Sequence, residues 1–134
     1  MLAVLFSVNS QRHGLDSAVV EGIVPSVPLR PEPGAPAAMA GIFSYRGQAV
    51  PVIDLSYLAG GKYASSFLST RIILVKAAHL EGGTRLLGLL AECVNEVRQI
   101  SSRDAVRVVT LPELLPVDLL AQLPGASPAA NLSP

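Results

Sequence analysis

Two apolar runs that flank a glycine turn constrain the fold of this chain more than any other feature. They are RIILVKA at 71–77 and RLLGLL at 85–90, with HLEGGT between them. Gly82 and Gly83 permit a chain reversal, so the segment is predicted to form a β-hairpin. Because both runs are apolar at consecutive positions, both strands are expected to be covered on two faces. These strands favour an all-β fold.

Further short strands are expected on both sides of this hairpin. The segment HGLDSAVVEGIV at 13–24 is interpreted as a turn that leads into one of them. Prolines at 25, 28, 31, 33 and 36 cannot donate ladder hydrogen bonds and predict an exposed connector. The other expected strands lie at 3–8, 42–45, 49–53, 91–97 and 106–109.

The C-terminal part of the chain has a different pattern. LPELLPVDLLAQL at 111–123 has helical spacing, and Pro116 predicts that this helix breaks or restarts. PGASPAANLSP, the last 11 residues, has the composition of a disordered tail. We therefore expect one domain at 1–123 and a disordered tail at 124–134.

The composition favours a partner-binding protein. Half of the residues are hydrophobic, 15% are charged and the mean hydropathy is +0.47, which is more apolar surface than a small monomer hides. Ten basic residues balance ten acidic ones, and no run of like charge occurs. Nothing in that distribution would neutralise a phosphate backbone, so no nucleic-acid partner is expected.

The sequence predicts a cytoplasmic protein without membrane insertion. Its first residues, MLAVLFSVNSQRHG, contain an apolar run too short for the core of a signal peptide and no preceding positive region. No stretch approaches the roughly 18 apolar residues of a membrane span. A single cysteine, Cys93, cannot form an internal disulfide.

A search for catalytic chemistry gives no convincing set of residues. His13 and His79 lie in no metal-ligand spacing and beside no nucleophile in sequence, so both are interpreted as structural. Asp54 is expected to cap the short turn or helix that begins at Leu55. GGKY at 60–63 departs from a phosphate loop. We expect no enzyme activity, no catalytic residue, no metal site and no cofactor.

The order of several segments resembles the CheW-like family of chemotaxis coupling proteins. HGLD precedes VVEGIV, and PGAPAAMAGIFSYRGQAVPVIDL, TRIILV and GLLAECVNEV follow in turn. The densest part of the resemblance is RG-x-x-VPVIDL at 46–55, and a weaker match returns at VRVVTLPELL, 106–115.

That resemblance implies two small SH3-like β-barrels that share an apolar core, followed by a short C-terminal helix. It also implies a non-catalytic adaptor, a scaffold for signal transduction. Its partners would be the cytoplasmic tip of a chemoreceptor and the regulatory domain of a CheA-type histidine kinase. YRGQAVPVIDLSYLA and LSTRIILV more closely resemble the branch that serves surface-sensing systems.

The resemblance also assigns four residues to the partner-binding surface: Arg46, Gly47, Val20 and Ser44. Arg46 matches an arginine on the turn before the VPVIDL strand, where its planar fork could bind a partner carboxylate or carbonyl. The alternative for Arg46 is an ordinary solvated turn residue, and for Val20 it is core packing.

The chain departs from the family pattern in three places. Gly22 stands where an acidic residue is common, with Glu21 one place earlier, and Ser44 replaces an asparagine. The long segment usual between NEV and the final strand is reduced to about residues 98–103. One barrel is therefore expected to be incomplete, and its open strand edge could support a homo-oligomer.

An alternative function is a small-ligand-binding module, because β-barrels with apolar mouths can hold metabolites. No set of convergent polar groups around a glycine-rich or aromatic pocket supports that alternative in the sequence. The adaptor is therefore the leading hypothesis.

Overall fold

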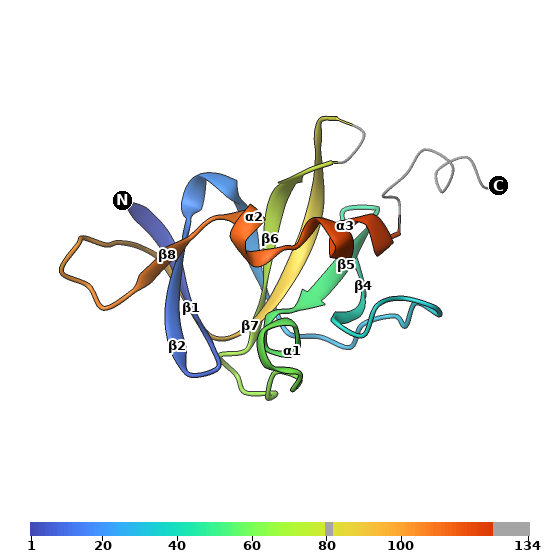
Figure 1. Ribbon diagram of the computed structural model, residues 1–134, viewed down its shortest axis with the longest axis horizontal. Coiled ribbons are helices and arrows are strands. Elements are labelled where there is room, and N and C mark those ends of the chain that lie inside the picture. Colours follow the sequence, from blue (N-terminus) through green and yellow to red (C-terminus); the bar gives the residue numbers. More distant parts are fainter. Residues whose placement is uncertain (80–81, 125–134) are drawn as a thin grey trace.

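The computed structural model describes residues 1–79 and 82–124 and shows a mostly β protein with short helices near its C-terminal end (Figure 1). The strands are β1 (Leu2–Val8), β2 (Gln11–Asp16), β3 (Val20–Pro25), β4 (Met39–Tyr45), β5 (Gln48–Asp54), β6 (Arg71–Ala78), β7 (Thr84–Gln99) and β8 (Arg107–Val109). The helices are η1 (Ser17–Val19), a 3₁₀ turn, and α1 (Leu55–Gly60), α2 (Leu111–Leu114) and α3 (Val117–Gln122).

The central hairpin is present as predicted. β6 and β7 pair antiparallel from Arg71↔Ala91 to Ala78↔Thr84. The run at 72–75 is buried throughout, and in β7 the buried part of the run is 87–89. Leu80 and Glu81, in the predicted turn, lie outside the described residues.

The first hairpin differs from the sequence prediction. HGLD at 13–16 is part of strand β2, not a turn, and the reversal lies at Asn9 and Ser10. Both residues have positive φ, 50° and 65°, and asparagine tolerates this left-handed conformation better than most residues. The second bend of this region is η1, where the Asp16 carboxylate accepts a hydrogen bond from the Ala18 amide at 2.9 Å.

The C-terminal helices follow the pattern that Pro116 predicted. α2 ends before this proline and α3 begins after it. The predicted boundary between a domain at 1–123 and a tail at 124–134 stays a prediction, because 125–134 lie outside the described residues.

The 16-residue strand β7 joins two sheets. We call β1, β2, β8 and the C-terminal part of β7 (92–99) the small sheet. The N-terminal part of β7 (84–91), with β3, β4, β5 and β6, forms the large sheet. β7 has a positive φ of 49° at Cys93, near the point where the strand passes from one sheet to the other. The two small β units implied by the family resemblance are therefore linked by one continuous strand.

The two sheets repeat the same pairing scheme. In the large sheet β5 pairs parallel with β7, with Val52 opposite Gly88 and Ile53 opposite Leu89. In the small sheet β8 pairs parallel with β2, with Val108 opposite Gly14 and Leu15 opposite Val109. Each of these strands is followed by a short helix, α1 or α2. VRVVTLPELL at 106–115 is thus the structural counterpart of VPVIDLSYLA at 50–59.

The sheets differ in how far they close. β4 lies antiparallel along the outer edge of β5, whereas β8 pairs with β2 alone among the described strands. The large sheet encloses the buried residues Val50, Val52, Ile72 and Leu74 with several partly buried neighbours. The small sheet has a lesser cluster of Ala3, Leu5 and Ile100, with Val106 against it. The main core lies between the sheets, which confirms the shared apolar core. Among the described strands β8 has no neighbour on its outer edge, which confirms the incomplete barrel.

Candidate functional site

Arg46 lies at the apex of the β4–β5 hairpin, as the sequence predicted. Tyr45 pairs with Gln48, so Arg46 and Gly47 form a two-residue turn. Their φ angles are 48° and 79°. A turn with positive φ at both positions matches the twist of the flanking strands, and Asn-Gly is its preferred sequence. The turn therefore holds an arginine in a conformation that is unfavourable for it.

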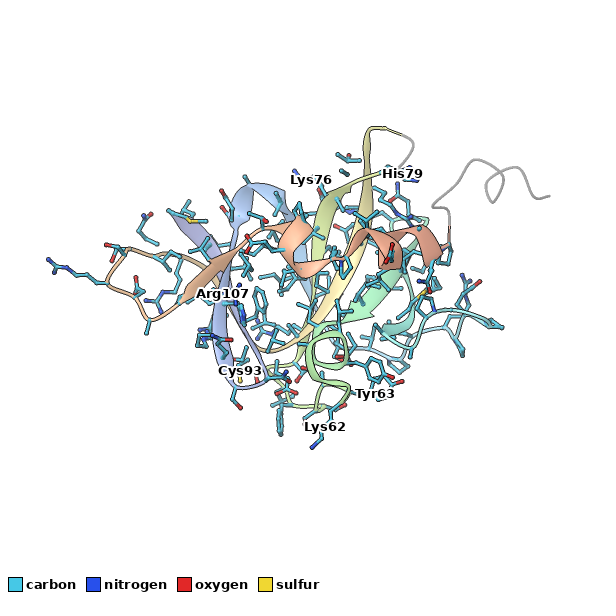
Figure 2. All side chains as sticks on the ribbon, viewed as in Figure 1. Lys62, Tyr63, Lys76, His79, Cys93 and Arg107 are labelled. Carbon is cyan, nitrogen blue, oxygen red and sulfur yellow. The ribbon has the colours of Figure 1, made fainter. Side chains whose placement is uncertain are left out.

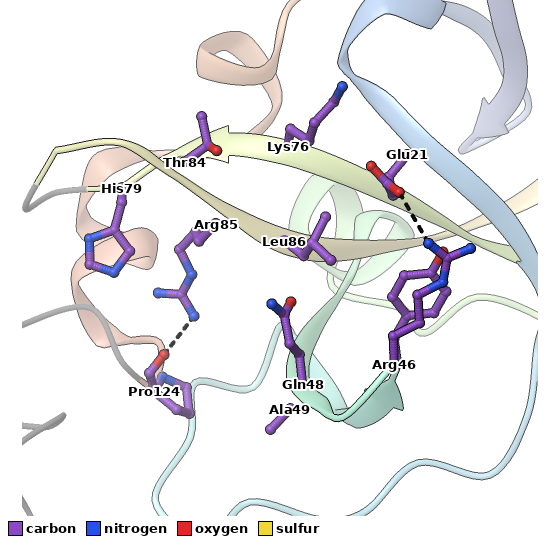
Figure 3. A pocket seen from close by; sticks show the side chains of 11 residues that line it. Glu21, Arg46, Gln48, Ala49, Lys76, His79, Thr84, Arg85, Leu86 and Pro124 are labelled. Carbon is purple, nitrogen blue, oxygen red and sulfur yellow. Dashed lines mark hydrogen bonds and ion pairs between the residues drawn. The ribbon is translucent and has the colours of Figure 1, made fainter.

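The Arg46 side chain extends over the surface, not into the core. Its guanidinium carbon lies 5.0 Å from the centre of the Tyr45 ring. Its Nη1 lies 4.0 Å from Oε2 of Glu21 on β3, and 77% of the side chain is exposed (Figure 3). An exposed ion pair of this kind contributes only about 0–1 kcal/mol to stability. Arg46 is therefore oriented by two weak contacts and stays accessible to a partner.

Arg46 borders a broad surface hollow of about 790 Å³, which we call the basin. The basin is lined by three cations, Arg46, Lys76 and Arg85, and by one carboxylate, that of Glu21. Lys76 stands at the same end of the β6–β7 hairpin as His79, another lining residue (Figure 2). The local charge of the basin is positive, although the whole chain has a formal net charge of zero.

Arg85 is held more firmly than the other basin cations. It donates a hydrogen bond from Nη2 to the backbone carbonyl of Pro124 at 2.6 Å (Figure 3). Burial lowers the pKa of the Arg85 guanidinium from its usual value, but arginine stays charged near neutral pH. This contact ties the end of the described chain to the wall of the basin.

Val20 lies beside the basin, in a separate groove of about 390 Å³ between β3 and the C-terminal part of β7. Val20, Gly22 and Ile23 form one side of this groove, and Glu96 and Val97 form the other. Val20 is half-buried and packs against the main core, which is the packing role considered for it; its role in partner binding stays a prediction. Glu21 lines both hollows and connects Val20 with Arg46.

Gly47 and Ser44 lie on a third hollow, of about 520 Å³, with Val27, Pro28 and Arg30 of the connector. Gln48 and Ala49 line both this hollow and the basin. The structure thus distributes the four predicted site residues over three adjoining hollows around the β4–β5 hairpin. It does not gather them into one pocket.

Sequence reasoning did not identify Glu21, Lys76 and Arg85 as companions of Arg46. Lys76 interrupts the apolar run RIILVKA, and Arg85 begins the run RLLGLL. The presence of these two charged residues in a hairpin predicted to be buried was the signal that could have identified a functional surface. Glu21 was noted only because it lies one position before the place where the family commonly has an acidic residue. Its contact with Arg46 depends on how β3 pairs with β6.

Of the residues interpreted as structural, His13 and Asp54 have structural surroundings, whereas His79 lines the basin. His13 is buried, stacks on Phe6 with ring centres 5.6 Å apart, and its Nδ1 lies 3.0 Å from the Gln11 carbonyl oxygen. The Asp54 carboxylate accepts hydrogen bonds from the Tyr57 amide at 3.1 Å and the Ala64 amide at 3.0 Å, which confirms its capping role. Among residues 1–79 and 82–124, no group of three or more histidine, cysteine or acidic residues is arranged to bind a metal. Within the same residues, no helix has the length and apolar character needed to cross a bilayer.

Comparison with known proteins decides the family. A model of the CheW-like domain matches residues 2–115. The chain belongs to the CheW-like family. The resemblance inferred from RG-x-x-VPVIDL and its neighbouring segments is therefore confirmed.

Individual CheW proteins match parts of the chain. The chemotaxis protein CheW of Rhizobium meliloti (strain 1021) is 30% identical over 101 residues, which make up 75% of this chain and 62% of that protein. The chemotaxis protein CheW of Treponema pallidum (strain Nichols) is 38% identical over 52 residues, 39% of this chain and 31% of that protein. The chain therefore spans less than two thirds of the length of either relative.

A solved CheW structure supports the same fold. The scaffolding protein TtCheW from Thermoanaerobacter tengcongensis superposes with a TM-score of 0.63 at 32% sequence identity. The match covers 75% of this chain and 66% of that one. Two linked β units with an apolar core between them are thus the CheW architecture, here with a small sheet that does not close.

Proposed function

We propose that this protein is a non-catalytic adaptor that couples the cytoplasmic tip of a chemoreceptor to the regulatory domain of a CheA-type histidine kinase. The observation that carries the proposal is the placement of Arg46, exposed on a strained turn at the edge of the cationic basin. Strained backbone persists where the surrounding structure holds it, and it is enriched at functional sites. Membership of a family whose relatives are named chemotaxis and scaffolding proteins supports the same role.

The charges of the basin suit an acidic partner surface. Arg46 can present a planar fork to a carboxylate or to a backbone carbonyl, while Tyr45 and Glu21 limit the directions of its side chain. Lys76 and Arg85 would add a longer-range attraction that guides the encounter and weakens with salt. We assign the kinase regulatory domain to this basin.

The neighbouring groove has a different chemistry and suits a different partner. Val20, Ile23 and Val97 supply apolar area, and Glu21 and Glu96 supply acidic groups at its borders. An amphipathic helix of a receptor tip could lay its apolar side into such a groove. Glu21 belongs to both hollows, so occupation of one would alter the position of a charge in the other.

Gly47 and Ser44 are proposed as secondary contacts on the far side of the hairpin. Gly47 permits the positive φ that presents Arg46, and its role is therefore to position that side chain. Ser44 is exposed beside the connector and could form a hydrogen bond at the edge of either interface.

Replacement of Arg46 tests this function directly. Arg46→Ala should weaken binding to the kinase regulatory domain or the receptor tip by about 1.5–3 kcal/mol, the range for hydrogen bonds to a charged group. Arg46→Lys should restore only part of the affinity, because a point charge cannot reproduce the fork. Binding is measured by calorimetric titration, and folding by urea denaturation of the same proteins.

Arg103→Ala is the matched control, because it removes an exposed arginine from the loop before β8, outside the basin. It should leave both affinities unchanged. Equal affinities of the parent and Arg46→Ala for both partners would refute the proposal. A large loss of stability in Arg46→Ala would instead identify a structural role for the arginine.

A second candidate function, small-ligand binding, is favoured by one observation. An apolar cavity of about 540 Å³ lies between the β2–η1 turn, the end of β6 and the C-terminal helices, with Leu15, Leu111 and Leu120 among its lining residues. Its size and apolar character suit a small hydrophobic molecule. If this is the function, decanol should raise the Tm of the protein, and Leu120→Trp, which fills the cavity, should abolish the rise. An unchanged Tm would exclude decanol-like ligands.

A further inference from the structure

The outer edge of β8 is the main irregularity in the repeated architecture of this protein. In the large sheet, the equivalent edge of β5 is paired with β4 from Met39↔Ile53 to Tyr45↔Gln48. In the small sheet, β8 pairs only with β2 among the described strands. Such an edge presents unpaired backbone donors and acceptors, which are a template for another strand.

The side chains at this edge lack the cover that their counterparts have. Val52 in β5 is fully buried, whereas Val108 in β8 is 48% exposed. β4 contributes Ala40, Phe43 and Tyr45 to the cluster around Val52. By strand alternation, Val108 shares a face with Val106, which packs on the cluster of Leu5 and Ile100. An added strand would therefore complete both the backbone pairing and a small apolar cluster.

We propose that the strand which completes the small sheet is β8 of a second copy of this chain, placed antiparallel across a two-fold axis. That strand would take the place that β4 holds beside β5, with the same relative direction. A two-fold pairing of identical edges satisfies the unpaired backbone groups of both copies at once, because each β8 strand pairs with the other. A different partner would satisfy only one of them.

Side-chain chemistry selects the register of this pairing. If the axis passes beside Val108, the two Val108 side chains lie directly opposite one another on the same face. Arg107 then stands opposite Val109 of the second copy, so the two arginines avoid a direct like-charge contact. Arg107 itself lines a hollow with His13 and Glu113, whereas Val108 is absent from that lining. The chain has a formal net charge of zero, so no overall repulsion opposes association.

The first test is sedimentation equilibrium of the full chain over a range of concentrations. We expect a reversible monomer–dimer equilibrium that Val108→Lys weakens at least tenfold, because an edge lysine blocks strand addition. Val117→Lys is the matched control: Val117 is also exposed, at 68%, but it lies on α3. This control should dimerise like the parent.

The second test reports the register. In a Cys93→Ser background, Val108→Cys should form a disulfide-linked dimer under mild oxidation, because directly opposed residues lie about 4.5–5.5 Å apart, within disulfide range. Val117→Cys in the same background should stay monomeric under denaturing conditions. Cross-linking of the Val108→Cys chain supports the proposal independently of any effect of lysine on folding.

Three results would overturn the proposal. The first is a parent chain that stays monomeric at all concentrations, together with no cross-linking of the Val108→Cys chain. The second is a dimer that Val108→Lys leaves unchanged. The third is a Val108→Lys chain that loses only kinase or receptor binding, which would give the edge to another partner. Arg46→Ala should keep the dimer and Val108→Lys should keep kinase binding, so the adaptor proposal and this one can fail separately.

Discussion

β5 and β8 hold equivalent positions in the two sheets but have different surroundings. Both pair parallel with a central strand, place a valine opposite a glycine and lead into a short helix. Val52 is nevertheless buried and Val108 half exposed, because β4 covers β5 and no described strand covers β8. The difference shows that similar local sequences acquire different burial from their lateral neighbours. The large and small sheets should therefore differ in the stability that their cores contribute, in the interfaces that they form and in the substitutions that they tolerate.

The largest effect is expected from matched core truncations. Leu74 pairs with Gly88 in the large sheet, and Leu5 occupies the same place opposite Gly14 in the small sheet. Leu74→Ala should lower the free energy of unfolding by about 4 kcal/mol, and Leu5→Ala by about 2 kcal/mol, since the less enclosed site can relax. Urea denaturation measures both losses. Equal losses would show that the small sheet is as well packed as the large one.

An intermediate effect is expected from the two glycines at the parallel pairings. A Cβ at Gly88 would lie 2.9 Å from side-chain atoms of both Ile72 and Val52, whereas one at Gly14 would approach Val106 at 3.0 Å. Gly88→Ala should cost about 1–3 kcal/mol of stability, the range for overpacking. Gly14→Ala should cost less, because its Cβ would meet only one atom nearer than 3.4 Å, on Val106, whereas that of Gly88→Ala would meet two at 2.9 Å. Thermal unfolding of both variants checks the order, and a reversed order would contradict the comparison.

The smallest single loss is expected at a helix cap, that of α2. Asp54 is buried and accepts hydrogen bonds from two backbone amides, whereas Thr110 is exposed and pairs with the Glu113 side chain. Asp54→Ala should cost about 2 kcal/mol and Thr110→Ala about 0.5 kcal/mol, the two ends of the range for such caps. Chemical denaturation of the pair provides the measurement. A larger loss for Thr110→Ala would mean that α2 contributes more to stability than α1.

Much of the fold could be predicted from local sequence signals. Gly82, Gly83 and the apolar runs beside them identified the central hairpin, and Pro116 identified the break between α2 and α3. The first turn was misplaced because Asn9-Ser10 and the later HGLD both contain turn-forming residues, and the reversal lies at Asn9-Ser10. Local patterns identify elements when one candidate turn stands out, and they fail when two neighbouring segments both contain turn-forming residues.

The candidate site also has a part that the sequence predicted and a part that it did not. The apex position of Arg46 follows from RG between two strands, so the sequence predicted it. Its proximity to Glu21 and the positive basin could not be predicted, because they depend on the pairing of β3 with β6 and on the position of Arg85 near Pro124. These contacts join segments far apart in the chain.

By itself, the sequence determined the family, the short strands, most of the turns and the exposed arginine, because these depend on local residue chemistry and on motifs within a few tens of residues. Tertiary structure alone decided that β7 spans both sheets, that β8 repeats the role of β5 and that Val108 lacks the cover of Val52. The physical reason is that a strand satisfies its backbone hydrogen bonds laterally, and the identity of its neighbours is a property of the folded chain.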